Sequence, residues 1–315
     1  ADVGTTECVY SMQVLGTVAV DGVIVYDGTE DAPAATAKLA LNLAETVKAS
    51  VGELALGNGI AMTVSGKVSI DGAVSLAGGE TDAATIVFAA GSDIAINADV
   101  TVGAKATITA SGAVEVNAAI SLGEGAKFTS TGTMTVKAAI DATTKDSALV
   151  SGSKLTMAAG GAITAVAEVK AGTAVLDSTN YDGAYYKTGT ASAPVHNYVT
   201  ADMAFAALSA GTTDAVKLYG AQTVLVSATI EAGDTVALEL GATLTIGDAD
   251  NTDVILTIAK DAKVQGTTTS KIDIKGTLYA EKKTDITNTL RSGKIDSDVY
   301  AYEVNENGKE VSSGW

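Results

Sequence analysis

The sequence predicts an all-β protein, a parallel β-helix or β-solenoid with about twenty residues per coil and short capping helices. Three observations carry this prediction: a core composition of small and β-branched residues, a repeat of twenty residues, and apolar residues that alternate within short segments. Hydrophobic residues make up 47% of the 315-residue chain, but aromatic residues make up only 4%. Such a composition suits thin, stacked strands better than a large globular core.

The repeat is clearest in two adjacent blocks, 101–120 (TVGAKATITASGAVEVNAAI) and 121–140 (SLGEGAKFTSTGTMTVKAAI). Eight of the twenty positions are identical, among them Gly103/Gly123, Gly112/Gly132, Val116/Val136 and Ile120/Ile140. Earlier blocks keep apolar residues at the same interval: Phe88, Ile94, Ile96 and Val100 precede Ile108, Val114, Val116 and Ile120, and Val68, Val74 and Leu76 lie one interval further back.

The same interval returns downstream in three apolar rows. The rows are Leu218, Leu238, Ile258 and Leu278; Val224, Leu244 and Val264; and Val216, Val236 and Leu256. Within each block the apolar residues alternate, which is typical of strands with one face turned inward, and Gly, Asn or Asp separates the strands. Short strands repeated in register predict one coil per block, stabilised by its neighbours.

Two segments depart from this pattern and predict helices. Residues 31–50 begin with Asp31 as a candidate N-cap and Pro33 in the first turn, and continue rich in Ala, Leu and Lys. The second predicted helix, over residues 200–210, has Thr200 or Asp202 as its candidate N-cap and stops at Gly211. Each helix is expected to cover the open end of a first coil, where unpaired backbone groups would otherwise be exposed.

This arrangement predicts two solenoid units, 1–195 and 196–315. The first has an N-terminal strand and the helix near 31–50, and the second has the helix near 200–210 and a polar C-terminal segment. The Tyr-rich stretch 177–200, with the only histidine, His196, is expected to be an irregular linker.

The charge limits the partners that we expect. Lys and Arg number 20 against 37 Asp and Glu, a net charge of −17. This balance argues against nucleic acid, whose phosphates require basic residues. No apolar stretch of the sequence is long enough to span a membrane. The sequence opens with Ala1-Asp2-Val3, as it would after removal of a signal peptide or after trimming of the chain. We expect the protein to be extracellular, at the cell surface.

The single cysteine, Cys8, excludes an internal disulfide framework and a cysteine-based zinc site. In an exported protein it is either a buried small apolar side chain or an intermolecular disulfide partner. The second alternative would join two copies of the chain.

The run 66–76 (GKVSIDGAVSL), continued through Ile140, resembles the repeats of prokaryotic β-solenoid cell-surface proteins, which include adhesin-like, surface-layer and archaeal sheath proteins. The resemblance covers about two thirds of the chain and is one of pattern. It implies an extracellular structural or adhesive role.

Right-handed β-helices also include polysaccharide-active enzymes. Asn251-Thr252-Asp253 matches one motif of polygalacturonase-like hydrolases, but the paired Asp, the Gly-His-Gly and the Arg-x-Lys motifs are missing from the sequence. The only arginine, Arg291, lies in the polar tail, away from any carboxylate site of the pectate-lyase type. A single histidine cannot form a two-histidine metal site. We therefore predict no catalytic residue and no required cofactor.

The best candidate metal site is the loop with Asp248, Asp250 and Asp253, whose alternating carboxylates suit Ca²⁺. The alternative is an Asp/Asn turn between two coils. The function predicted from the sequence is a subunit of a self-assembling lattice, sheath or fibre whose main partner is the chain itself. The alternatives are an adhesin or carbohydrate-binding β-helix that contacts cell-wall polysaccharide, and a polysaccharide-active enzyme.

Overall fold

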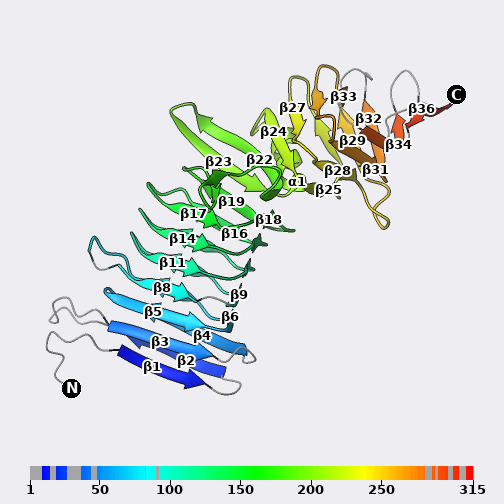
Figure 1. Ribbon diagram of the computed structural model, residues 1–315. Coiled ribbons are helices and arrows are strands. Elements are labelled where there is room, and N and C mark those ends of the chain that lie inside the picture. Colours follow the sequence, from blue (N-terminus) through cyan, green and yellow to red (C-terminus); the bar gives the residue numbers. More distant parts are fainter. Residues whose placement is uncertain are drawn as a thin grey trace. The chain divides into compact units, whose positions relative to one another are not determined.

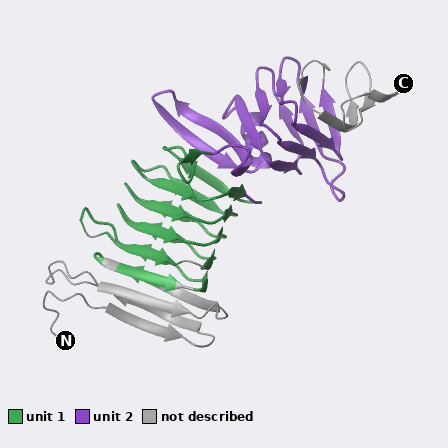
Figure 2. Cartoon of the chain, viewed as in Figure 1, with its two compact units in different colours: residues 1–156, 160–175 green, residues 157–159, 176–315 purple. Residues whose placement is uncertain are grey.

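The computed structural model describes residues 9–14, 19–26, 37–43, 48–81, 83–89, 92–280, 286–287, 290–296, 301–304 and 310–314, with side-chain detail between 54 and 280 and at Ile286. It is an all-β parallel solenoid of about 22 residues per turn with one short helix (Figure 1). The chain divides into two compact units, 1–156 with 160–175 and 157–159 with 176–315 (Figure 2). Residue 195, the predicted boundary, lies inside strand β23.

Each coil from β5 to β19 contributes one strand to each of three rows. The first row contains β1 (Val9–Val14), β3 (Ala37–Leu43), β5 (Ile60–Ser65), β8 (Thr85–Phe88), β11 (Thr107–Ala110), β14 (Lys127–Ser130), β17 (Ala148–Ser151), β20 (Lys170–Ala171) and β21 (Ala174–Val175). The second contains β6 (Lys67–Ile70), β9 (Asp93–Ile96), β12 (Val114–Val116), β15 (Met134–Val136) and β18 (Leu155–Met157). The third contains β7 (Val74–Leu76), β10 (Val100–Val102), β13 (Ile120–Leu122), β16 (Ala139–Ala142) and β19 (Ala162–Ala165).

The second and third rows begin together. Strand β2 (Ala19–Tyr26) pairs with β4 (Lys48–Leu56), and β4 pairs in turn with both β6 and β7. All these pairings are parallel except β20–β21.

The predicted register is confirmed in the middle of the first unit. Val114 pairs with Ile94 and Met134, and Val116 pairs with Ile96 and Val136, each twenty residues away. Val116 and Val136 are fully buried. The strands alternate buried and exposed residues, as a solenoid with an apolar interior requires.

The interval changes outside this region, and several predicted partners are wrong. Val68 pairs with Ile94 and Val74 with Val100, twenty-six residues apart, because that coil carries a longer connection around 77–84. Ile86, not Phe88, pairs with Ile108. Whether a side chain points inward depends only on the alternation of residues within its strand. A coil can therefore lengthen at a turn without changing which strand residues are buried.

The second unit begins with an antiparallel hairpin and a helix. The hairpin comprises β22 (Tyr181–Thr190) and β23 (Ala193–Val199), and helix α1 (Ala201–Ser209) follows. The predicted linker over 177–200 is therefore wrong, because tyrosines favour strands and pair across the hairpin. The predicted helix near 200–210 is confirmed: the Thr200 hydroxyl accepts from Met203 N, and Gly211 follows with φ +65°.

The coils of the second unit again form three rows. They are β24 (Ala215–Tyr219), β27 (Thr235–Leu238), β30 (Lys263–Gln265) and β33 (Ile286–Thr287); β25 (Ala221–Val224), β28 (Thr243–Ile246) and β31 (Lys271–Ile274); and β26 (Ala228–Ile230), β29 (Ile255–Ile258) and β32 (Thr277–Ala280). Strand β34 (Leu290–Asp296) pairs with both β31 and β32, and the antiparallel strands β35 (Ala301–Val304) and β36 (Glu310–Gly314) follow.

The downstream rows of twenty are only partly right. Val216 pairs with Val236 and Leu218 with Leu238, as predicted. Val236 then pairs with Val264, twenty-eight residues on, and Leu256 pairs with Leu278 on a different row of strands. A longer turn in the coil between β28 and β29 breaks the constant interval.

The helix predicted over 31–50 is wrong. The described residues there form strands β3 and β4, and β3 pairs in parallel with β1 and β5. The sequence Lys38-Leu-Ala-Leu-Asn-Leu43 alternates with a period of two, and pairing on both edges outweighs the helix propensity of Ala and Leu.

Candidate functional site

The predicted calcium loop is organised by one of its carboxylates. Asp248 Oδ1 accepts hydrogen bonds from Asp250 N at 2.9 Å, from Asn251 N at 2.8 Å and from Asn251 Nδ2 at 2.8 Å. These bonds, that of the Asn251 side chain first, lower the pKa of Asp248 below its ordinary value. The arrangement is an Asp/Asn turn between β28 and β29, in which the Asp248 carboxylate caps backbone N–H groups.

Asp250 and Asp253 are exposed on this loop. Across the part of the chain that the structure describes, no three His, Cys, Asp or Glu side chains gather as they would around a metal ion. Calcium binding by Asp248, Asp250 and Asp253 stays a prediction. Cys8 lies outside the described residues.

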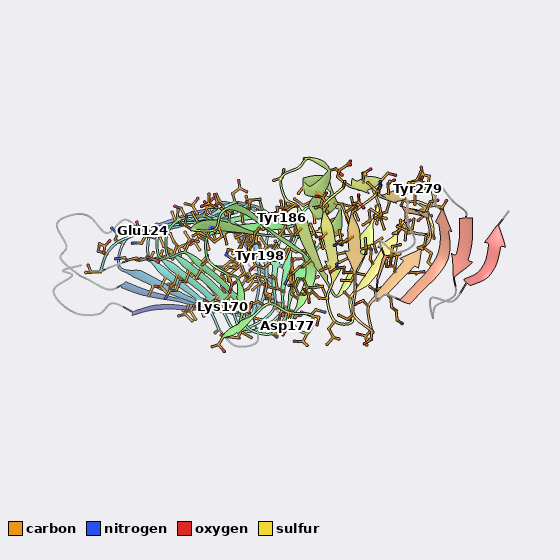
Figure 3. The ribbon with its side chains drawn as sticks, turned by 90° about the horizontal axis from the view of Figure 1, so that it is seen from above. Glu124, Lys170, Asp177, Tyr186, Tyr198 and Tyr279 are labelled. Atoms are coloured by element: carbon orange, nitrogen blue, oxygen red, sulfur yellow. The ribbon has the colours of Figure 1, made fainter. Side chains whose placement is uncertain are left out.

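The histidine expected in a linker is instead a buried strand residue. His196 lies on β23 with 4% of its surface exposed, and its Nδ1 is 2.9 Å from Tyr185 Oη. Tyr198, labelled in Figure 3, is likewise buried, with 4% of its surface exposed. The Tyr185 and Tyr198 rings are 4.9 Å apart between centroids.

Tyr181, the first residue of β22, extends this aromatic cluster. Its ring is fully buried, packs edge-on against Tyr198 at 5.8 Å, and donates its hydroxyl to Ala184 O at 2.8 Å. Burial raises the pKa of Tyr181 well above its ordinary value. A neutral, hydrogen-bonded phenol in such a position stabilises the hairpin, and the cluster is therefore structural.

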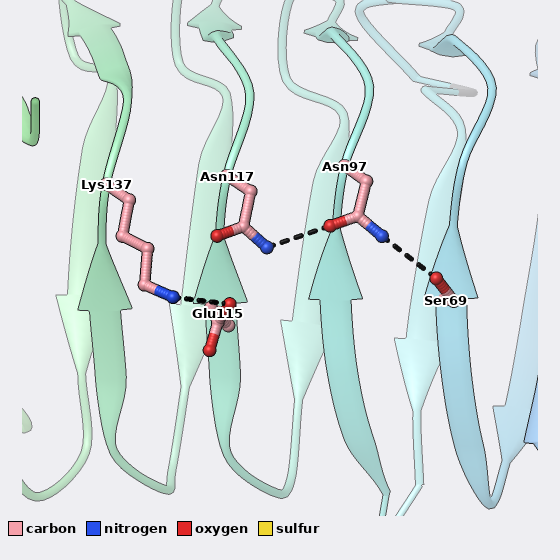
Figure 4. Close-up of polar contacts among 5 residues, drawn as sticks. All are labelled: Ser69, Asn97, Glu115, Asn117 and Lys137. Carbon is pink, nitrogen blue, oxygen red and sulfur yellow. Dashed lines mark hydrogen bonds and ion pairs between the residues drawn. The ribbon is translucent and has the colours of Figure 1, made fainter.

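The most developed arrangement of polar side chains lies on the second row of the first unit. We call it the polar ladder: Ser69, Asp71, Asn97, Asn117, Glu115 and Lys137. Figure 4 shows five of these side chains following one another from strand to strand along the row. They come from four successive coils, and positions 71, 97, 117 and 137 stack at the ends of β6, β9, β12 and β15.

Hydrogen bonds join side chains of the ladder from one coil to the next. Asn117 Nδ2 donates to Asn97 Oδ1 at 2.8 Å (Figure 4). Asn97 Nδ2 donates to Ser69 Oγ at 2.9 Å and to Asp71 Oδ1 at 2.7 Å. At the other end, Lys137 Nζ lies 2.7 Å from Glu115 Oε1.

Glu115 is fixed by two neighbours. The hydrogen bond from Lys137, followed by that from Asn117, lowers the pKa of Glu115 below its ordinary value. The bond from Lys137 joins two neighbouring coils, whereas Asn117 lies in the same coil as Glu115. Exposed hydrogen bonds and ion pairs contribute little to stability individually, so their main effect is to hold the outer surface in one arrangement.

A hollow opens beside the ladder on the same strands. We call it the trough; it has a volume of about 400 Å³ and is open to solvent. Its lining consists of Lys67, Val68, Asp93, Ile94, Ala95, Ala113, Val114, Glu115, Thr133 and Thr135. Lys67 Nζ lies 3.6 Å from Asp93 Oδ2 across the β6–β9 step.

Sequence reasoning missed both the ladder and the trough. Their residues lie in separate coils, and the twenty-six-residue interval between β6 and β9 removes the register that would have aligned Ser69 and Asp71 with the later coils. The Asn97–Asn117 pair, twenty residues apart, was the available signal.

No protein-family model, curated protein or solved structure matches the chain. Among the described residues, none forms a helix long and apolar enough to cross a bilayer.

Proposed function

We propose that this chain is an extracellular structural protein, a subunit of a self-assembling lattice, sheath or fibre at the cell surface. The observation that carries the proposal is the pairing at the ends of the described stack. Strand β1 pairs with β3 alone, β2 with β4 alone, and β36 with β35 alone, among the strands that the structure describes.

A strand with one partner presents a row of backbone N–H and C=O groups along its other edge. Such edges pair readily with a strand of another chain unless charge, proline or a bulge protects them. The six residues of β1, VYSMQV, include neither a charged residue nor a proline. This composition favours addition of a strand from a second copy.

The contacts between coils suit a structural subunit. Ion pairs join neighbouring coils at Lys67–Asp93, Lys105–Glu80, Lys137–Glu115 and Lys217–Glu239 within the described residues. Together with the polar ladder, they link the outer surfaces of coils whose interiors are already stacked. Repeated local contacts of this kind support a stiff stack of coils within each unit.

Sedimentation velocity of the full chain at increasing concentration, without reductant, tests the proposal. We expect large assemblies that grow with concentration, and we expect deletion of residues 1–20 to weaken assembly while leaving the far-UV β signal intact. A wild-type chain that stays monomeric at high concentration would overturn the proposal.

A point variant separates edge pairing from general loss of structure. Ser11→Lys places a charge on β1, and edge strands that carry lysine resist further pairing. Thr101→Lys adds the same charge at an exposed position of β10, a strand that already has partners on both sides. We expect assembly to weaken with Ser11→Lys and not with Thr101→Lys; equal behaviour would contradict pairing through β1.

A further inference from the structure

The trough has a floor of small side chains between taller polar ones. Ala95 on β9 occupies the position that Ser69 holds on β6 and Glu115 holds on β12. Ala113, just before β12, occupies the position that Thr133 holds in the next coil. The half-buried Ala95 and the exposed Ala113 therefore form a low apolar floor among side chains that carry carboxylate, ammonium and hydroxyl groups.

The charged side chains of the trough lining are paired, although the chain as a whole carries −17. Lys67 lies beside Asp93 and Lys137 beside Glu115, so each of the two carboxylates of the lining has its own cation. The trough is thus a locally balanced area on an acidic protein. A strongly charged ligand would find no unmatched charge in the lining.

The polar groups of the lining are of both hydrogen-bonding kinds. The carboxylates of Asp93 and Glu115 accept, the Lys67 ammonium donates, and the hydroxyls of Thr133 and Thr135 do both. Because Lys67, Asp93 and Glu115 are each paired with a side chain of a neighbouring coil, less ordering of these three groups is needed when they bind a ligand. Their natural complement is a neutral molecule with many hydroxyl groups and an apolar C–H face to lie against the alanine methyls.

The spacing of the strands adds a length requirement. The trough crosses β6, β9, β12 and β15, and neighbouring strands lie about 4.8 Å apart, close to the roughly 5 Å that one pyranose unit spans in an extended β-linked glycan. A chain of about three such units would present its hydroxyl groups at the same interval as the coils.

We propose that the trough over β6, β9, β12 and β15 is a binding site for a neutral, extended oligosaccharide, seated on Ala95 and Ala113 and hydrogen-bonded to Asp93, Glu115 and Lys67. The site is separate from the strand edges used in self-assembly, and the proposal does not depend on assembly. A subunit with this site would hold a neutral polysaccharide along its side.

The test is titration of the full chain with cellotetraose as the neutral probe, monitored by calorimetry, with tetragalacturonate as the acidic counterpart. Ala95→Leu fills the floor of the trough, and Ser121→Leu makes a similar change at an exposed position of β13, on another row. Far-UV circular dichroism and sedimentation of each variant show whether the fold and the assembly state are kept.

We expect saturable binding of cellotetraose, a loss of at least tenfold in affinity with Ala95→Leu, and unchanged affinity with Ser121→Leu. Absence of binding up to about 10 mM, a dissociation constant at the weak limit of specific recognition, would overturn the proposal. So would equal affinity in the wild-type chain and Ala95→Leu, or binding of tetragalacturonate alone. None of these results would bear on self-assembly, which sedimentation reports independently.

Discussion

Gly112 lies at a corner where successive coils come so close that no side chain fits. A Cβ at this position would overlap the carbonyl oxygen of Ser92 in the preceding coil, and one at Gly132 would overlap the carbonyl oxygen of Gly112. Gly112→Ala must therefore push two coils apart. The backbone at Gly112 does not have a positive φ, so crowding alone determines the effect.

The cost follows from the bonds on either side of the corner. Separation of the coils would weaken Ile94 N→Ala113 O at 3.0 Å and Ser111 N→Phe88 O at 2.9 Å. Two such bonds contribute about 0.5–1.5 kcal/mol each, and overpacking adds about 1–3 kcal/mol. We expect Gly112→Ala to lower the free energy of unfolding by about 2–6 kcal/mol.

Gly125→Ala is the matched control in the next coil. Its φ is +66°, but the nearest atom to a new Cβ is Lys105 Cγ at 3.3 Å, in a flexible side chain. Left-handed strain alone should cost about 1–2 kcal/mol. Urea unfolding followed by far-UV circular dichroism measures both variants. Gly112→Ala no more destabilising than Gly125→Ala would refute the close approach of the coils.

Three further predictions concern single side chains. Ser92→Ala should raise the free energy of unfolding by about 1 kcal/mol, because Ser92 Oγ is buried with no hydrogen-bond partner among the described residues. Ser130→Ala should lower it, because this change removes the hydrogen bond from Ser130 Oγ to Gly112 O at 3.1 Å. Thermal unfolding that shifts both variants the same way would contradict this. Since the pKa of Asp248 is lower in the folded state, the stabilisation that its carboxylate provides is complete above the ordinary value of 3.8 and is lost as pH falls through the lower folded value. In acid unfolding, Asp248→Asn should lack this pH-dependent loss of stability, and Asp253→Asn should keep it. Cys8→Ser should abolish any disulfide-linked dimer on a non-reducing gel, and a dimer that persists in the variant would exclude Cys8 as the link.

The sequence predicts the solenoid because its strongest signals are local. Alternation within three or four residues determines which side chains turn inward, and identical residues such as Gly112 and Gly132 occupy the same crowded corner in successive coils. The capping of α1 by Thr200 is likewise contained within a few residues. Features of this range can be read without knowing the rest of the fold.

Features that depend on pairing between distant residues could not be predicted in this way. The Ala- and Leu-rich segment of β3 is a strand because it has partners on both edges, and the twenty-eight-residue step from Val236 to Val264 depends on turn lengths. The trough depends on the same alignment, since Lys67 and Asp93 meet only after a coil of twenty-six residues. The Asp/Asn turn at Asp248, the alternative to a calcium site, could be predicted because its bonds lie within four residues.

Electron microscopy of the purified full chain, at high concentration and without reductant, tests the proposal of a self-assembling subunit most directly. We expect filaments or sheets built from the solenoid, which disperse when Ser11→Lys places a charge on the edge strand β1. Dispersed single particles of the wild-type chain under these conditions would contradict it.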